Sequence, residues 1–475
     1  FKMDLEYRND TRKVGTICSA CIVYSFLLEK ILKIDIKTKS VLNTISLYFE
    51  RRMVRILLLG IIQGFPFVLI YTALTLWLRD NEFSRTQVAF LSLIGIVYGF
   101  NWIWSPLIDL IKLPLITKII GHRKSWIVFM QFIILSCLII WGLHDPKDNI
   151  WIIGLAGLII ALASSTQDIV TDALRIEQIK KNESGSMSAG AGVMVIGWFT
   201  GYKVGGIITL FLAEYLEGLG IQNFWQITFL LLTIFILICN ISLMFIPEAK
   251  PINLQMRQKK TLLGPFVSFF KSRGIKIGIY IIIFLFLFKI GEAFLGRMSI
   301  IFYDDIGFSK KDIALYSKGY GYIVTIIFTI LGSFFAIRSG LIKGMIIAGL
   351  LMASTNLLFS VLAWYGKSDL LFASAVILDE ITSAISTVIF VAFVSVLVDR
   401  TYTATHYALM ASIATLGKNV FSSFSGYVVD NLEFLNTSTN SHNDWVVFFI
   451  ITTIMVFPSL GFLWMIKDKL KINNE

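Results

Sequence analysis

Histidine, cysteine and charged residues are scarce in this sequence, and their scarcity excludes several classes of function. Only 4 histidines and 4 cysteines occur among 475 residues. Neither an H-E-x-x-H helix motif nor another metal-ligand spacing is present. The sequence also lacks a phosphate-binding loop of the form G-x-x-x-x-G-K-[ST] and a G-x-S-x-G nucleophile elbow. These absences argue against a membrane enzyme and an ATP-driven pump, and they give no reason to expect a metal or another cofactor.

Charged residues make up only 15% of the chain, whereas a soluble protein carries roughly 25%. Hydrophobic residues make up 56% and the mean hydropathy is +0.76. The apolar residues fall in blocks of about 20, the length that crosses a hydrocarbon core of roughly 30 Å. The composition therefore predicts an all-α polytopic protein embedded in membrane lipid. In that setting the net charge of +11 indicates basic loops on one side of the membrane rather than binding to nucleic acid.

Twelve apolar segments are predicted to span the membrane in two groups of six. The first group is 54–78, 86–111, 125–143, 150–174, 187–213 and 224–246. The second group is 275–303, 312–336, 342–363, 369–398, 404–428 and 445–466. We expect a bundle over 51–246, a linker loop over 247–274, a second bundle over 275–467 and a tail over 468–475. Two parallel six-helix repeats around a central site are the layout of a major facilitator transporter.

The distribution of basic residues predicts the orientation of these spans. Both bundle flanks and the loops after spans 2, 4, 6, 8 and 10 carry several times more lysine and arginine than the other loops. The positive-inside rule places this basic side, with both bundle termini, in the cytoplasm. Residues 1–50 do not fit the plan, and we interpret them as an extension outside the bundle, translated from upstream of a native start at Met53. The alternative is an amphipathic helix on the membrane surface.

Ionisable residues within spans are functional candidates because burying a charge in a membrane is costly. Three lysines are expected to present cations to an anionic substrate, and three acidic residues are expected to bind substrate or carry protons. They are Lys203, Lys289, Lys418, Glu292, Asp379 and Glu380. A simpler alternative is that Lys289 and Glu292, three positions apart, neutralise each other. Adjacent Asp379 and Glu380 cannot share one helix face, so at most one should line a central cavity.

The stretch SSTQDIVTDALRIEQ (164–178) ends span 4 with several polar side chains. Counting 1.5 Å per residue from Trp151 places Asp168 roughly 26 Å and Asp172 about 32 Å along the helix. Because this depth is close to the cytoplasmic surface, we expect an inner gate here, with Asp172 pairing to Arg175. Gln167 and Asp168 lie highest on the helix and are predicted to face the cavity. Asp109, near the end of span 2, belongs to the same predicted set of gating residues.

Ordered motifs across 54–466 resemble those of one transporter family. They are GIIQGFPF (60–67), WSPLIDL (104–110) with GHRKSW (121–126), STQDIVTDA (165–173), GYKVGG (201–206), FKIGEAF (288–294), TATHYALMASIATLGK (403–418) and SGYVVD (425–430). On these motifs the chain resembles the AmpG-type anhydromuropeptide permeases, which are major facilitators. The resemblance implies a monomer in the bacterial inner membrane. It also implies proton-coupled import of N-acetylglucosamine–anhydro-N-acetylmuramic acid carrying an anionic stem peptide.

The sequence departs from this family at several positions. Asn101 stands where the family usually has a lysine, Lys203 and Lys418 stand where arginine is commoner, and Glu292 replaces a usual aspartate. A lysine keeps the charge but loses the bidentate grip of arginine. The TQDIVTDA element is also similar to the related acetyl-coenzyme A transporters, so a nucleotide-bearing or other organic anion is an alternative substrate. The loss of a buried cation at Asn101 keeps a third hypothesis open, a non-transporting sensor or decayed paralogue.

Overall fold

The structure, a computed structural model, describes residues 43–83, 87, 91, 93–180, 182–248, 263–308, 321–436 and 442–470. The chain divides into two compact units, Phe1–Glu50 and Arg51–Glu475. In the first unit the described part contains a helical turn over 43–46 and the 3-10 helix η1 (Leu47–Phe49). The rest of the predicted extension, 1–42, lies outside the described residues. The second unit carries all the predicted spans and is described below.

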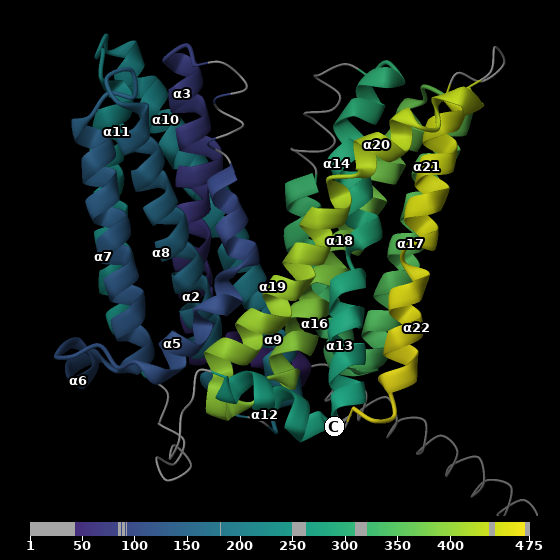
Figure 1. The fold of residues 1–475 in the computed structure, drawn as a ribbon, viewed down its shortest axis with the longest axis horizontal. Helices are drawn as coiled ribbons and strands as arrows, with labels where there is room; N and C mark the ends of the chain where they lie inside the picture. The colour runs from purple at the N-terminus through teal and green to yellow at the C-terminus, as the bar shows by residue number, and fades with distance from the viewer. Residues whose placement is uncertain are drawn as a thin grey trace, which may run out of the picture. The chain divides into compact units, whose positions relative to one another are not determined.

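Wherever the second unit is described, its regular structure is helical. Its first half contains α2 (Arg51–Val68), η2 (Leu69–Ala73), α3 (Leu74–Asp80), η3 (Leu93–Gly99), η4 (Asn101–Ile103), α5 (Ser105–Leu110), α6 (Ile116–Ile120), α7 (His122–Leu143), α8 (Ile150–Glu177), α9 (Ser184–Phe199), η5 (Thr200–Val204), α10 (Gly205–Gly218) and α11 (Phe224–Met244). Its second half contains α12 (Gly264–Arg273), α13 (Ile275–Leu287), α14 (Ile290–Asp305), α16 (Gly321–Ser339), α17 (Leu341–Tyr365), α18 (Asp369–Leu397), η8 (Arg400–Tyr402), α19 (Thr403–Ser422), α20 (Ser425–Asp430), η9 (Glu433–Leu435), α21 (Asn443–Ile454) and α22 (Phe457–Ile466). Figure 1 shows α2 to α11 gathered in one bundle and α13 to α22 in another.

Within the described residues, ten helical segments are long and apolar enough to cross a membrane. They match ten of the twelve predicted spans to within a few residues, except that the described part of span 8 begins at Gly321. The predicted span 86–111 is not one long helix, because its described part is divided among η3, η4 and α5. Glycines and Pro106 in this segment weaken a continuous α-helix. Span 11 is present as α19 and α20, but its many polar residues keep it out of the ten.

Several predicted spans contain irregular backbone, and in three of them it lies near the candidate site. In span 1 the π-helix η2 follows Pro66, which cannot donate a hydrogen bond to the carbonyl of Ile62. In span 5 the π-helix η5 carries Lys203, and in span 7 the break between α13 and α14 carries Lys289. Irregular turns in membrane helices commonly occur at functional sites, because they expose polar backbone and side chains toward a cavity.

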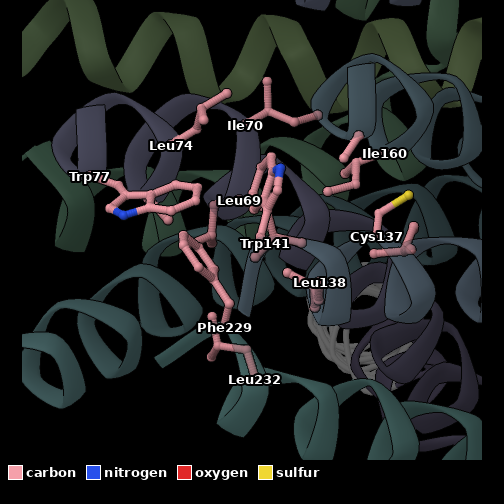
Figure 2. Close-up of a cluster of buried hydrophobic side chains, with 14 of the residues drawn as sticks. Leu69, Ile70, Leu74, Trp77, Cys137, Leu138, Trp141, Ile160, Phe229 and Leu232 are labelled. Atoms are coloured by element: carbon pink, nitrogen blue, oxygen red, sulfur yellow. The ribbon is translucent and has the colours of Figure 1, made fainter. Parts of the chain in front are cut away.

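Two different kinds of packing hold the first half together. Helix α2 crosses α9 and η5 at a pair of G-x-x-x-G motifs, Gly60 with Gly64 on α2, and Gly197 of α9 with Gly201 of η5. A Cβ at any of these glycines would collide with backbone of the facing helix, so the close crossing requires glycine. At the other end, Trp77, Trp141 and Phe229 form the centre of a buried apolar cluster (Figure 2). This rigid packing fixes the helices that carry the candidate site.

The two halves meet through a limited set of helices. Helix α9 packs on α16 and α18, and α19 packs on η3, η4, α5 and α8. One group of these contacts involves the last turns of α8 and α18, the first turn of α19, and α5. We call this region, together with α12 and the start of α7, the basic end, because the loops rich in lysine and arginine adjoin it (lower part of Figure 1).

Candidate substrate site and gate

Five aromatic side chains of the first half surround one another on α2, η2, η3, α9 and η5. The ring of Phe67 lies 5.7 Å from Tyr71, 4.6 Å from Tyr98, 5.1 Å from Trp198 and 6.5 Å from Tyr202, measured between ring centroids. We call these five residues the aromatic group. None of them is fully buried, and Tyr71 is 41% exposed. The rings therefore offer apolar faces to a ligand. The sequence analysis did not single them out, although Phe67–Tyr71 and Trp198–Tyr202 each have a spacing of four.

Asp168 of α8 lies beside the aromatic group. Its carboxylate interacts electrostatically with the hydroxyls of Tyr71 and Tyr98, and the Tyr98 hydroxyl donates a hydrogen bond of 2.7 Å to Ser164 Oγ. Within the described residues, Asp168 Oδ1 has no hydrogen-bond partner, although the atom is buried. A buried acceptor without a donor is costly. This oxygen is therefore a natural place for a proton or for a hydroxyl group of a ligand.

Lys203 reaches from the first half to the second. Its side chain leaves the π-helix η5, and Nζ lies 5.0 Å from the centroid of the Tyr322 ring on α16. An ammonium group over an aromatic face is stabilised by the ring quadrupole. The structure thus places Lys203 between the two halves, where a carrier of this layout binds its substrate.

Lys289 and Glu292 form an ion pair at the break between α13 and α14. Lys289 Nζ lies 2.7 Å from Glu292 Oε2 and donates a hydrogen bond of 2.7 Å to Thr387 Oγ1 of α18. Glu292 Oε1 accepts a hydrogen bond of 2.9 Å from Ser383 Oγ, also of α18. The two charges therefore neutralise each other, as the simpler alternative required. The pair is held against α18 rather than left free.

Lys418 and the acidic residues of α18 complete the charges of the second half. Lys418 is exposed and interacts electrostatically with both members of the Lys289–Glu292 pair. Asp379 interacts with the same pair and accepts a hydrogen bond of 3.4 Å from Thr355 Oγ1 on α17. We call Lys289, Glu292, Asp379 and Lys418 the charged group. The side chain of Glu380 takes a different direction, toward α16, where it accepts a hydrogen bond of 2.9 Å from Thr325.

Gln167 does not occupy the position that the sequence predicts. Its side chain is fully buried instead of facing a cavity, and Nε2 donates a hydrogen bond of 2.8 Å to the carbonyl oxygen of Ile62 on α2. This is the carbonyl that Pro66 leaves without its helical donor. The expectation that Gln167 faces a cavity is therefore corrected. Its amide satisfies a broken turn of the neighbouring helix.

Ion pairs at the basic end include the predicted pairing of Asp172 with Arg175. Arg175, which is fully buried, lies 3.1 Å from Asp172, as expected from their spacing. It also donates a hydrogen bond of 2.9 Å to Ser395 Oγ on α18, and its guanidinium lies 5.6 Å from the ring centroid of Tyr407 on α19. One arginine of the first half is thereby fixed to two helices of the second.

Asp109 forms a second link between the halves. Its Oδ1 accepts a hydrogen bond of 2.8 Å from Arg123, which also pairs with Glu177 at 2.8 Å. Its Oδ2 accepts hydrogen bonds from the backbone N–H and the hydroxyl of Thr405, at 2.9 and 2.7 Å. Thr405 lies in the first turn of α19, where free N–H groups and the helix dipole favour a negative charge.

Three further contacts join the two halves. Arg400 donates hydrogen bonds to the carbonyls of Ile176 and Ile179. Buried Asn101 accepts a hydrogen bond from Ser412 of α19.

Glu248 secures the start of α7 on the same side. It accepts hydrogen bonds from the backbone N–H groups of Arg123 and Lys124, at 2.7 and 3.2 Å. Gly121, with φ of +98°, provides the room for this contact. Burial raises the pKa of the Glu248 carboxyl above its ordinary range. The sequence analysis singled out Asp109, Asp172 and Arg175 by their charge. Their partners in the other half could not be predicted from sequence spacing.

Comparisons with known proteins agree with this architecture. No family model matches the chain. A protein named AmpG 4 from Rickettsia conorii (strain ATCC VR-613 / Malish 7) is 28% identical over 433 residues, covering 90% of this chain and 99% of the relative. The anhydromuropeptide permease of Escherichia coli (strain K12) is 25% identical over 430 residues, covering 90% of this chain and 82% of the relative.

Solved structures show the fold. The major facilitator superfamily transporter FucP in its outward conformation superposes with a TM-score of 0.64 at 12% identity, covering 87% of this chain and 99% of FucP. The major facilitator superfamily proton:xylose symporter XylE superposes with a TM-score of 0.61 at 13% identity, covering 88% of this chain and 96% of XylE. The named relatives are permeases rather than enzymes. The chain is therefore a multi-pass secondary transporter with the major facilitator fold, related in sequence to the AmpG-type permeases.

Proposed function

We propose that this protein imports anionic anhydromuropeptides across the bacterial inner membrane, coupled to protons. The observation that carries the proposal is a set of charges at the broken middle of span 7, in a chain related to a protein named anhydromuropeptide permease. Lys289 and Lys418 supply cations for the carboxylates of a stem peptide. Asp168, Glu292 and Asp379 supply carboxylates that can exchange protons. Glu380 and Lys203 are candidates for additional substrate contacts.

In the proposed transport cycle, the basic end is the cytoplasmic gate. The contacts made by Asp109, Arg175 and Arg400 join the halves there, and Asp172 holds Arg175. In the proposed cycle, this conformation is the one closed toward the cytoplasm. Substrate enters from the opposite side and binds between the halves. Opening toward the cytoplasm then requires Arg175 to release Ser395 and Asp109 to release Thr405. Each contact lies within one polypeptide, so the cycle requires only a monomer.

Uptake by membrane vesicles tests the proposal. Right-side-out vesicles containing the protein should accumulate radiolabelled disaccharide-peptide when a proton gradient is present, and an uncoupler should abolish the accumulation. Vesicles lacking the protein are the control. Uptake that ignores the uncoupler would refute proton coupling, and no uptake would refute the substrate. Competition by acetyl-coenzyme A, but not by muropeptides, would favour the alternative of a nucleotide-bearing anion.

A further inference from the structure

The two halves of the transporter offer different chemistry to a ligand. In the first half, the aromatic group provides ring faces, tyrosine hydroxyls and the free acceptor of Asp168. In the second half, the charged group provides two ammonium groups and two carboxylates at the break of span 7 and on the helices that face it. An elongated substrate with one neutral end and one charged end would match this division.

The charges around each group indicate which half binds the neutral end of such a substrate and which half binds its charged end. Asp168 and Asp172 are the carboxylates of α8 near the aromatic group, so this region repels another carboxylate. Asp172 is already paired with Arg175 and accepts a hydrogen bond of 3.1 Å from Gln63, whereas Asp168 Oδ1 is free to accept from a hydroxyl. Sugar hydroxyls are donors, and sugar rings present apolar C–H faces that pack on aromatic rings.

Lysine placement supports the complementary assignment for the second half. Lys418 is exposed, and it lies close enough to the Lys289–Glu292 pair to influence both charges. Glu292 neutralises Lys289, so Lys418 is left as the cation that an incoming carboxylate can approach.

We infer that the disaccharide of the substrate stacks on the aromatic group with a hydroxyl donating to Asp168, while a stem-peptide carboxylate binds at Lys418. This inference rests on the proposed function and adds the orientation of the substrate. One molecule would then contact both halves at once. A ligand that bridges two repeats can shift their equilibrium, because its affinity depends on how the halves are placed.

Binding measurements with two probes separate the two subsites. The probes are the amide of N-acetylglucosaminyl-anhydro-N-acetylmuramic acid, called the bare disaccharide, in which the lactyl carboxyl is an uncharged amide as it is in the substrate, and the same disaccharide carrying its stem peptide. Affinities for the full chain in detergent are measured by isothermal titration calorimetry. Tyr71→Ala should lower the affinity for both probes about tenfold, since the Tyr71 ring would contact any sugar on the aromatic group. Lys418→Ala should weaken only the peptide-bearing probe, because the bare disaccharide has no stem-peptide carboxylate.

Three further variants make the result interpretable. Trp198→Phe keeps an aromatic face and should retain most of the affinity, whereas Asp168→Asn should weaken both probes. Trp364→Ala removes an indole that is 69% exposed on α17, and it should change neither affinity. An equal loss of affinity for both probes in Lys418→Ala, or no loss of affinity in Tyr71→Ala, would overturn the inferred orientation but not the proposed function. Failure of the bare disaccharide to bind while the peptide-bearing probe binds would also overturn it. Failure of the wild type to bind either probe would overturn the proposed function as well.

Discussion

Asp109 in the first half caps helix α19 in the second half through Thr405. The same carboxylate holds Arg123, so the cap and the ion pair depend on one residue. Removing one partner of a buried ion pair costs about 3–5 kcal/mol, because the remaining charge stays buried. If this energy favours the closed basic end, loss of Asp109 shifts the equilibrium toward an open one.

We therefore predict that Asp109→Ala exposes the start of α19. The reporter is Ala404→Cys, at a residue that is fully buried, in a chain whose native cysteines are replaced by alanine. A maleimide dye should label this cysteine more than about tenfold faster in Asp109→Ala. Asp148→Ala, which removes an exposed carboxylate from the loop after α7, is the matched control. An unchanged labelling rate in Asp109→Ala would show that the cap does not hold the gate closed.

Arg175→Met should destabilise the protein more than the double variant Asp172→Asn/Arg175→Met. Arg175 is fully buried, and its removal takes away the cation beside the Asp172 carboxylate while the hydrogen bond from Gln63 of α2 stays. The single variant should lose about 3–5 kcal/mol, whereas neutralising both partners should recover much of it. Thermal unfolding in detergent, followed by tryptophan fluorescence, measures both. Equal losses would mean that Asp172 tolerates burial without its arginine.

Asp168→Asn should uncouple transport from the proton gradient. Its Oδ1 is buried without a hydrogen-bond partner in the described structure, so this oxygen can receive a transported proton. We expect the variant to exchange labelled for unlabelled substrate but to lose accumulation driven by a proton gradient. Asp148→Asn serves as the control in the same vesicles. Full proton-driven accumulation in Asp168→Asn would remove this residue from the coupling machinery.

Asn101→Lys should open the basic end to a similar extent as Ser412→Ala. The Asn101 side chain accepts a hydrogen bond from the Ser412 hydroxyl of the other half. A lysine side chain has no acceptor, so Asn101→Lys loses this hydrogen bond. Both variants should increase labelling at Ala404→Cys, by a smaller factor than Asp109→Ala, since a neutral hydrogen bond contributes only about 1 kcal/mol. Normal labelling with restored or improved uptake in Asn101→Lys would indicate instead that a cation at this position aids transport. It would contradict a closing role for Asn101.

The spans were predictable because membrane helices depend on local composition. Predicted span 369–398 corresponds to α18 over Asp369–Leu397, since lipid accepts only apolar segments with internally satisfied backbone. The breaks within the predicted span 86–111 were not predicted, because hydropathy does not reveal how η3 and η4 pack against α8 and α19. The 247–274 segment was expected to be a loop, yet its described part contains α12. A ten-residue helix with two lysine or arginine residues at its end carries no hydropathy signal of its own.

The site was predictable only in its charges. Lys289, Glu292 and Asp379 drew attention because ionisable residues are expensive in lipid, and the structure brings them together. The aromatic group was missed, since Phe, Tyr and Trp are common in apolar spans and only tertiary packing distinguishes a platform from a core. Gln167 was misplaced because spacing gives the face of α8 but not the partner that covers it. The one sequence signal for its partner is Pro66, which has no N–H to donate to the carbonyl of Ile62 four residues earlier.

The Gln167–Ile62 hydrogen bond therefore yields a prediction about Pro66. In Pro66→Ala the new backbone N–H can donate to the Ile62 carbonyl, so the amide of Gln167 is no longer its sole donor. Gln167→Ala should cost about 1 kcal/mol in the wild-type background and clearly less in Pro66→Ala. A double-mutant cycle of thermal unfolding in detergent measures this coupling. Asn240→Ala, which removes a side-chain hydrogen bond within α11, should be additive with Pro66→Ala. Additivity of Gln167→Ala with Pro66→Ala would show that the proline is not the reason for the glutamine.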